Sequence, residues 1–295
     1  MNARSLKILI ASRKLFSNWM LANIRYILAK YGLISGNITV KCDNNEISLT
    51  LGDYWNILEE YYSGLIDKLE CNDRIYAILN YKGYRIRLYD AFSFLNDIVN
   101  ENFFGEAYDD LDVNGKTVVD IGAGLGDTAI LFSLKGARRV LAFEPYPFLY
   151  KKALVNIKAN NLEDRVVLVN AGVGSTDGLV CAEANEINGY YYFKPSGKCD
   201  IKIKMYTLAS LIREYDVEEG SILKMDCEGC EYEVLQSIEP REFRLFSEIT
   251  IEYHNGYNKL VEMLESVGFK TYIKPIRSTP IPTEKQGYIV AQRLD

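Results

Sequence analysis

The chain has 295 residues, of which 48% are apolar and 25% are charged. That length allows one large domain or a core domain with an extension, and the composition excludes a disordered, collagenous or disulfide-packed chain. The 34 basic and 40 acidic residues give a net charge of −6, which argues against nucleic acid as the main partner.

The first predicted element is a basic helix over residues 5–31. Apolar residues share one of its faces because they recur at three-, four- or seven-residue spacing: Leu9, Phe16, Met20, Ile24, Ile27 and Tyr31. Residues 1–31 carry six basic residues and no acidic one, so the helix could form a peripheral contact with an anionic membrane. We favour packing of the apolar face on the rest of the protein, because Arg13 and Lys30 intrude toward it.

The rest of the N-terminal third mixes short helices and strands. The pattern predicts two strands within residues 37–50, a helix over 53–70, a hairpin over 74–90 and a helix over 91–104. We therefore expect an N-terminal helical and α+β extension over residues 1–110.

From residue 111 onward, strands and helices alternate. The predicted strands cover residues 117–121, 140–143, 166–169, 221–225, 248–253, 270–273 and 288–291. Alternation at this spacing predicts a mostly parallel sheet with helices on both faces, and thus one α/β domain over residues 111–295. Residues 179–205 break the alternation with the turn signals Asn188-Gly189 and Ser196-Gly197, and they predict an inserted antiparallel hairpin.

The cysteines and the apolar runs bear on the compartment. The sequence has no recognisable secretory signal and no apolar run of about 18 residues. We expect a cytoplasmic protein with mostly reduced thiols, and membrane association through residues 5–31 stays open. A disulfide between Cys181 and Cys199, which flank the insert, is the less favoured alternative. Cys227 and Cys230 lack the second ligand pair of a zinc site, so we expect them to pack as small residues.

A glycine-rich segment is the strongest local signal. The segment Asp120-Ile121-Gly122-Ala123-Gly124-Leu125-Gly126-Asp127-Thr128 follows a predicted strand and opens a predicted helix. Gly122 and Gly124 would let the backbone turn tightly and approach a ligand closely. Gly126 lies where the helix begins, so unpaired N–H groups could bind a carboxylate or a phosphate. Dinucleotide-binding folds use a similar turn.

Two acidic residues favour a different ligand. Glu144 ends the second strand of the domain, where an acidic side chain can accept both hydroxyls of an adenosine ribose. Asp120, beside the turn, would repel a pyrophosphate. It suits a ligand with a positive amino group and no phosphate, and S-adenosylmethionine (SAM) fits this pattern better than NAD.

Four sequence blocks resemble the FkbM-type family of SAM-dependent methyltransferases. They are V-V-D-I-G-A-G-L-G-D over residues 118–127, A-F-E-P-Y-P over 142–147, K-M-D-C-E-G-C-E over 224–231 and I-E-Y-H over 251–254. The resemblance covers about residues 105–293 in order and spacing. It implies a Rossmann-like seven-stranded sheet with an antiparallel last strand. It also implies an O-methyltransferase acting on hydroxyls of sugars, polyketides or other metabolites.

The resemblance also implies roles for individual residues. Asp120 and the glycine segment would bind the methionine end of SAM, and Glu144 would bind the ribose. Asn170 and Ala171 would lie near the adenine. The full set of expected cofactor-binding residues is Asp120, Gly122, Ala123, Gly124, Gly126, Asp127, Thr128, Glu144, Pro145, Asn170, Ala171 and Asp226.

Methyl transfer to a hydroxyl calls for a positioned base, which contributes roughly 10²–10⁴-fold to the rate. His254 is the single histidine and ends a predicted strand, at the edge where open parallel sheets bind ligands. Its ordinary pKa of about 6.5 would leave it mostly neutral at pH 7. Asp226 and Glu228 are the alternative base, and Glu252 would orient the imidazole or contact the acceptor.

These four side chains could also hold a divalent metal. We expect no metal, because carboxylates near a cationic cofactor already have a role. The run Tyr190-Tyr191-Tyr192-Phe193 could form a platform for an acceptor ring, although an edge strand with aromatic cross-strand pairs is the favoured interpretation.

Two other functions remain as alternatives to a small-molecule or glycan O-methyltransferase. An RNA methyltransferase would use the basic helix to bind phosphates, but the core is acidic and no Asn-Pro-Pro-aromatic block is present. A non-catalytic SAM-binding protein would keep the glycine segment without turnover.

Overall fold

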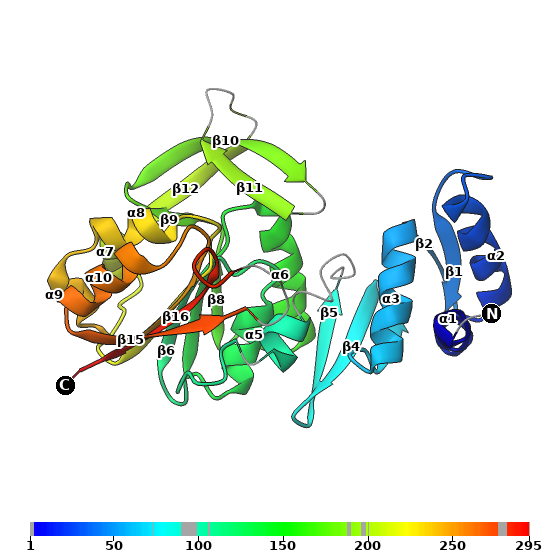
Figure 1. Cartoon of the computed structure of the whole chain (residues 1–295), viewed down its shortest axis with the longest axis horizontal. Coiled ribbons are helices and arrows are strands. Elements are labelled where there is room, and N and C mark those ends of the chain that lie inside the picture. The colour runs from blue at the N-terminus through cyan, green and yellow to red at the C-terminus, as the bar shows by residue number, and fades with distance from the viewer. Residues whose placement is uncertain are drawn as a thin grey trace. The chain divides into compact units, whose positions relative to one another are not determined.

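The computed structural model describes residues 3–72, 74–89, 99–105, 107–187, 190–195, 199, 201–276 and 282–294. The chain forms two compact units, Met1–Phe104 and Gly105–Asp295 (Figure 1). The division expected after residue 110 stays a prediction about how the chain is organised into domains.

The N-terminal unit contains helices and short strands, as expected. Its elements are α1 (Ala3–Leu15), α2 (Trp19–Lys30), β1 (Ile38–Cys42), β2 (Asn45–Leu49), α3 (Leu51–Ser63), β3 (Lys68–Cys71), β4 (Ile75–Tyr81), β5 (Tyr84–Tyr89) and a π-helical turn at Val99–Phe104. Antiparallel pairing joins β1 to β2, and β4 to both β3 and β5. The hairpin expected over residues 74–90 is thereby confirmed, while much of the helix expected over 91–104 lies outside the described residues.

The single helix expected over residues 5–31 is wrong, because α1 and α2 are separate. The side chain of Asn18 donates to the carbonyl of Thr39 at 3.1 Å and accepts from the amide of Lys41 at 2.7 Å. Phe16 is buried at the break. These contacts with distant residues hold the chain in a turn that local periodicity does not reveal.

The helix expected over residues 53–70 is too long. It ends at Ser63, where Gly64 takes the left-handed conformation with φ +84° and its amide bonds back to Tyr61. Glycine adopts this conformation without the steric cost of a side chain. The chain can then turn, and β3 begins at Lys68.

The second unit is built on a seven-stranded sheet in the order β15-β16-β14-β13-β6-β7-β8. Its elements are β6 (Thr117–Ile121), α5 (Asp127–Leu134), β7 (Arg139–Phe143), α6 (Pro147–Ala159), β8 (Val166–Val169), β9 (Gly172–Gly174), β10 (Gly178–Ile187), β11 (Tyr190–Pro195), β12 (Ile201–Thr207), α7 (Leu208–Glu214), β13 (Ser221–Met225), α8 (Glu231–Ser237), α9 (Pro240–Phe243), β14 (Phe246–Tyr253), α10 (Asn258–Ser266), β15 (Phe269–Pro275) and β16 (Gly287–Arg293).

The last strand, β16, runs antiparallel to both β14 and β15, whereas the other neighbours are parallel. Figure 1 shows α5 and α6 on one side of the sheet and α7 to α10 on the other. The fold class expected from the sequence is therefore confirmed. Parallel strands also bring their carboxyl ends to one edge of the sheet, which is where the candidate site lies.

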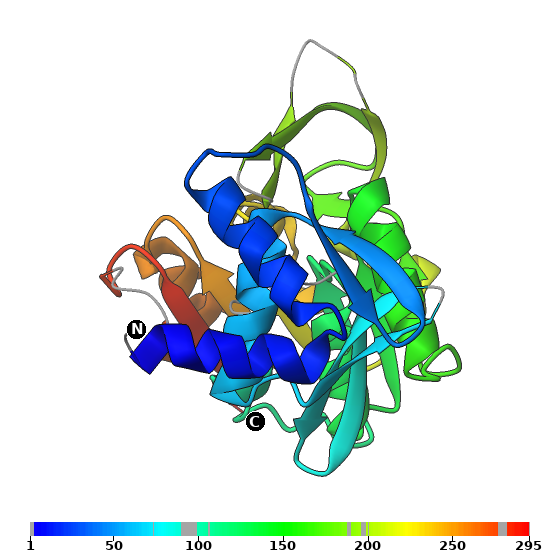
Figure 2. The same ribbon diagram turned by 90° about the vertical axis from the view of Figure 1, so that its right-hand side faces the viewer.

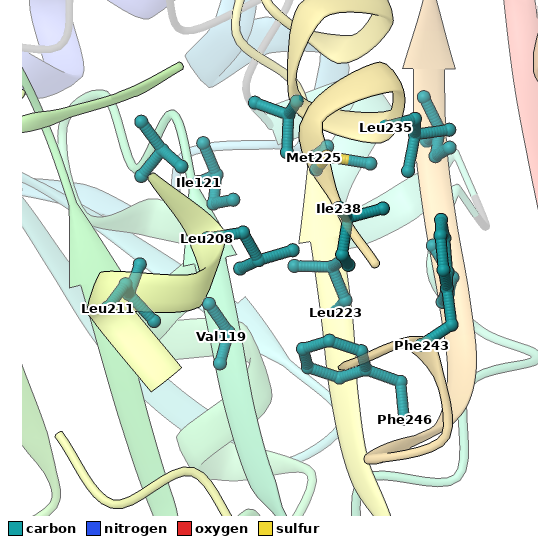
Figure 3. Packing of buried hydrophobic residues seen from close by; sticks show 14 of the residues in the cluster. Val119, Ile121, Leu208, Leu211, Leu223, Met225, Leu235, Ile238, Phe243 and Phe246 are labelled. Carbon is teal, nitrogen blue, oxygen red and sulfur yellow. The ribbon is translucent and has the colours of Figure 1, made fainter. Parts of the chain in front are cut away.

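The core explains the strands that the sequence predicted best. Every residue of β6 and of β13 is buried, as expected of strands covered on both faces. On one face, Val119 and Leu223 belong to an apolar cluster that also contains Leu208 and Leu235 from the covering helices (Figure 3). Lys224 is the one basic residue within β13, and its burial requires a partner.

The insert forms a small sheet of its own, in the order β11-β10-β12-β9 (yellow-green in Figure 1). Antiparallel pairing of β10 with both β11 and β12 confirms the expected hairpin. The two turn signals and the aromatic side chains of residues 190–193 lie outside what the structure describes, so the acceptor-platform hypothesis stays a prediction.

All six cysteines form disulfides: Cys42–Cys71, Cys181–Cys199 and Cys227–Cys230. The expectations of mostly reduced thiols and of a C-x-x-C pair that merely packs are therefore wrong. The Cα atoms of Cys42 and Cys71 lie 5.8 Å apart, within bridging range, but no sequence pattern reveals that proximity. Among the described residues, no helix is long and apolar enough to cross a membrane.

Candidate active site

The glycine segment forms the turn after β6. Gly122 has φ +80°, and a Cβ atom at this position would lie 1.8 Å from the carbonyl oxygen of Asp226. The turn after β6 therefore touches the turn after β13, and only glycine fits at this contact. The amides of Gly122 and Ala123 both donate to the carbonyl of Phe143, and Gly126 begins α5. The expected tight turn is confirmed, and the expected close approach to a ligand stays a prediction.

Asp120 is held by two partners within the fold. Its side chain is fully buried, with Oδ1 3.0 Å from Nζ of Lys224 and Oδ2 accepting from the hydroxyl of Thr128 at 2.6 Å. The carboxylate thereby fixes the start of α5, through Thr128, and the end of β13, through Lys224. Its expected contact with the methionine end of SAM stays a prediction.

Lys224 is a residue that the sequence analysis missed. Strand pairing places it opposite Asp120, and its ammonium also donates to the carbonyl of Gly122 at 2.8 Å. Burial lowers its pKa, but the negative charges of Asp120 and Asp226 outweigh that effect and raise the pKa above its ordinary value. Lys224 therefore stays charged and links the two touching turns. A lysine inside an apolar strand was the available signal.

Glu144 lies at the carboxyl end of β7 and is almost fully buried. One carboxylate oxygen accepts from the amide of Gly124 and the other from the amide of Tyr146, each at 2.9 Å. Burial raises its pKa to about 8 despite these donors. The side chain of Asn170 donates to the carbonyls of Glu144 and Pro145, so the expected ribose and adenine residues do come together. Ala171 is buried beside them.

His254 is surrounded by carboxylates. Its Nε2 lies 3.4 Å from Glu228 and 3.6 Å from Glu252, and its Nδ1 lies 3.5 Å from Glu231. The structure thus joins His254 to two of its expected partners. Asp226 is the third expected residue. It lies close enough to His254 that the charge of the imidazole acts on the pKa of its carboxyl group.

Glu231 was also missed. Its side chain is fully buried, and its Oε1 accepts from the amide of Cys227 at 3.1 Å. It lies in the first turn of α8, where an acidic residue is expected on helix grounds alone. Glu228 has φ +57°, uncommon for a residue with a side chain, and the Cys227–Cys230 disulfide closes the turn that presents it.

The surrounding carboxylates change the charge of His254. Burial lowers its pKa, but the hydrogen bond to Glu231 and the charges of Glu228 and Glu252 raise the pKa to about 9. The imidazole is therefore protonated at neutral pH, and the expectation that it is mostly neutral is wrong. Burial also raises the pKa values of Asp226 and Glu228 above their ordinary range.

The same group of side chains bears on metal binding. Asp226, Glu228 and His254 each offer a ligand atom, and these atoms lie within 4.8 Å of one another. Oxygen and imidazole ligands suit several divalent cations. That no metal is needed stays a prediction.

A model of the methyltransferase FkbM domain family matches residues 120–271, just over half of the chain. The chain is 26% identical over 213 residues to methyltransferase sdnD of Sordaria araneosa, covering 58% of this chain and 81% of that protein. It is 26% identical over 137 residues to hexuronic acid methyltransferase AglP of Haloferax volcanii, covering 46% of this chain and 55% of AglP. The match thus spans about half the length of AglP.

Among solved structures, the chain is similar to methyltransferase FkbM from Methylobacillus flagellatus KT, with 14% identity and a TM-score of 0.42 over 69% of this chain and 56% of that one. It is also similar to Aeropyrum pernix fibrillarin in complex with natively bound SAM, with 14% identity and a TM-score of 0.44 over 74% of this chain and 88% of that one.

Proposed function

The chain belongs to the FkbM methyltransferase domain family, and we propose that it transfers a methyl group from SAM to a hydroxyl oxygen of a small molecule or glycan. One observation carries the proposal: the turns after β6 and β13 touch at Gly122, and the second turn carries carboxylates that remain accessible. The side chain of Asp226 is 29% exposed and that of Glu228 is 48% exposed.

The charges at this edge fit SAM. The sulfonium and ammonium groups of SAM are positive, and the accessible Asp226 and Glu228 are negative when ionised. Lys224 lies 3.0 Å from Asp120 and 3.8 Å from Asp226, so its positive charge favours the ionised form of Asp226. At Gly122 the backbone of Asp226 occupies the place that a side chain would take, so the two turns meet with no side chain between them.

Glu144 would hold the ribose. Each of its oxygens accepts one backbone N–H, and a carboxylate oxygen has a second lone pair that a ribose hydroxyl could use. Pro145, Asn170 and Ala171 would border the adenine. Asn170 is tied to the backbone of this corner, which supports a pre-formed adenosine site.

When bound, SAM supplies a methyl group on a sulfonium, which departs as a neutral sulfide. The residues of this chain would align the acceptor oxygen and exclude water, because alignment is the main requirement of an in-line displacement. His254 would accept the hydroxyl proton at Nε2 or Nδ1 after losing its own, and Glu231 and Glu252 would hold the ring in place. Asp226 or Glu228 is the alternative base.

The acceptor class follows from the similarity to AglP. AglP is named as a hexuronic acid methyltransferase, which favours a sugar acceptor. The experiment is incubation of the purified full chain with tritium-labelled SAM and a panel of nitrophenyl glycosides, followed by chromatography. Labelled methyl ether on a glycoside supports the proposal. SAM binding without any labelled product would indicate the non-catalytic alternative.

A further inference from the structure

A hollow of about 580 Å³ lies in the second unit, and two of its lining residues, Tyr232 and Asn255, directly follow Glu231 and His254 in the sequence. It is lined by Tyr232, Asn255, Gly256, Tyr257, Asn258, Lys259 and Glu284. This volume lies within the range of small-molecule sites, roughly 300–1,000 Å³.

The hollow is linked along the sequence to the residues proposed for methyl transfer. Glu231 contacts His254, while their sequence neighbours Tyr232 and Asn255 contact each other: the amide of Asn255 donates to the Tyr232 hydroxyl at 3.1 Å. That hydroxyl donates in turn to the carbonyl of Gly256 at 2.6 Å. The wall of the hollow and the group around His254 are therefore joined through the same two backbone segments.

The hollow is pre-formed. Gly256 has φ +87°, and a Cβ there would lie 3.2 Å from the carbonyl of Glu284. The amide of Gly256 donates to the carbonyl of Lys285 at 2.9 Å. Tyr257 packs edge-on against Tyr253, with ring centroids 5.5 Å apart. Backbone and side-chain contacts thus fix the three segments that line the hollow, which are those around Tyr232, Gly256 and Glu284.

Its polar side chains are available. Among the described residues, no hydrogen bond or ion pair occupies the side chains of Asn255, Asn258, Lys259 or Glu284. Two amides, an ammonium and a carboxylate can all bind hydroxyls, because a hydroxyl both donates and accepts. The tyrosines add apolar ring surface. Glu284 would repel a polyanion.

We propose that this hollow binds the acceptor and that the acceptor is a glycosyl residue with neighbouring free hydroxyls. The proposal rests on the proposed methyl transfer and adds the acceptor class and its binding site. Asn258 and Lys259, at the start of α10, would bind ring hydroxyls while one further hydroxyl faces His254.

The test compares wild-type protein with the double variant Asn258→Ala/Lys259→Ala. Both positions are exposed, so the fold should be kept. Lys151→Ala is the matched control, an exposed helical lysine outside the hollow. The acceptors are p-nitrophenyl β-D-glucopyranoside, p-nitrophenyl β-D-glucuronide and p-nitrophenyl α-L-rhamnoside, with 4-nitrocatechol as the aromatic comparison. SAM binding is measured separately by calorimetry.

We expect methylation of at least one glycoside, with KM raised tenfold or more in the double variant, kcat within threefold of wild type and SAM affinity unchanged. Lys151→Ala should behave as wild type. Methylation of 4-nitrocatechol without any glycoside, or an unchanged KM in the double variant, would each overturn the proposal. No methylation of any acceptor, or no SAM binding by the wild type, would instead overturn the proposed function.

A second inference concerns the N-terminal helices, and it rests on independent observations. Figure 2 shows α1 and α2 as the two dark-blue helices. Large apolar side chains on them and just after them are exposed: Leu6, Ile10, Met20, Leu21, Ile24, Ile27, Tyr31, Leu33 and Ile34. The sequence favoured packing of this stripe on the rest of the protein, but Phe16 is its one buried member, and Met20, Ile24, Ile27 and Tyr31 are each more than half exposed.

Charge indicates what covers this apolar face. Residues 1–42 contain seven basic residues and no acidic one, and Lys7, Arg13, Lys14 and Arg25 are exposed. A second copy would bring like charges together, whereas an anionic bilayer offers both apolar volume and negative charge. We infer that the α1–α2 face binds the surface of an anionic membrane.

The test is co-sedimentation of the full chain with phosphatidylcholine vesicles and with vesicles containing 30% phosphatidylglycerol. Leu21→Glu/Ile24→Glu changes two exposed positions, and Leu154→Glu is the control, a leucine 47% exposed on α6. We expect binding to anionic vesicles only, weakened by 0.5 M NaCl and reduced at least tenfold in the double variant. Equal binding to neutral vesicles, no binding, or a dimer that the double variant dissociates would overturn the inference.

Discussion

Lys224 and Asp120 form an ion pair of 3.0 Å between neighbouring strands, and neither side chain is accessible to solvent. The pair ties the turn after β6 to the turn after β13, because Lys224 also binds the carbonyl of Gly122. Removing one partner of such a pair leaves a buried charge uncompensated. Both the free energy of unfolding and the geometry of the candidate site should therefore depend on this ion pair.

Lys224→Met should lower the free energy of unfolding by about 3–5 kcal/mol, the usual cost of breaking a buried pair from one side. Urea denaturation measures it. The matched comparison is Asp120→Asn/Lys224→Met, which removes both charges and should recover most of the loss. A single variant as stable as the wild type would contradict the role given to this pair.

Gly122→Ala should abolish SAM binding and strongly destabilise the second unit, because the new Cβ would meet the carbonyl oxygen of Asp226 at 1.8 Å. Gly220→Ala is the control. Gly220 has φ +83°, close to the +80° of Gly122, but nothing lies within 4 Å of its Cβ position. The Gly220→Ala variant therefore introduces the same backbone strain without the clash. Calorimetry with SAM and thermal melting compare the two. Equal behaviour of both variants would refute the contact.

Stability should fall as pH rises from 6.5 to 9. The folded chain keeps a proton on Glu144 up to a pKa of about 8 and on His254 up to a pKa of about 9, whereas the unfolded chain loses them near the ordinary values. The folded state therefore binds more protons throughout this window, and raising the pH favours unfolding. Melting temperatures across the range test this.

Glu144→Gln is the companion variant for that pH series. This variant removes the titrating carboxyl group of Glu144 and leaves His254, so the decrease in melting temperature between pH 6.5 and 8 should become shallower. A melting temperature that is constant or rises across the window would show that these protons are not retained on folding.

The pH–rate profile distinguishes the two candidate bases. With His254 as base, kcat/KM should rise tenfold per pH unit up to about pH 9, where the free enzyme loses the imidazole proton. His254→Asn should lower kcat by roughly 10²–10⁴-fold and remove the rise, with SAM binding kept. A rise confined to the acidic range, unchanged by this variant, would assign the base to Asp226 or Glu228.

Removal of metal provides a further test. We expect dialysis against EDTA to leave methyl transfer unchanged, because the carboxylates near His254 are assigned to the cationic cofactor and the imidazole. Turnover that is lost on chelation and restored by Mg²⁺ or Mn²⁺ would instead assign Asp226, Glu228 and His254 to a metal ion.

Strands and turns were predictable where the signal is local. β6 and β13 are mostly apolar, so both strands were predictable directly from their side chains, and Gly122 was predictable because a tight turn follows a buried strand. The break between α1 and α2 was not, since Asn18 bonds to residues of a later strand.

The site was predictable in its residues more than in its charges. Its motifs named Asp120, Glu144 and His254, but the charge state of each depends on groups brought in by folding. Lys224 neutralises Asp120 from a neighbouring strand, and three glutamates keep His254 protonated. The Cys42–Cys71 disulfide was missed for the same reason, because its pairing depends on a proximity that the sequence does not reveal. Cys181–Cys199 was the less favoured alternative, and Cys227 and Cys230 were expected to pack as small residues.

Calorimetric titration of the purified full chain with SAM tests the central claim most directly. We expect saturable binding of one SAM per chain, weakened at least tenfold by Glu144→Ala, and no comparable binding of NADH. Absence of binding at millimolar SAM, or equal affinity for NADH, would contradict it.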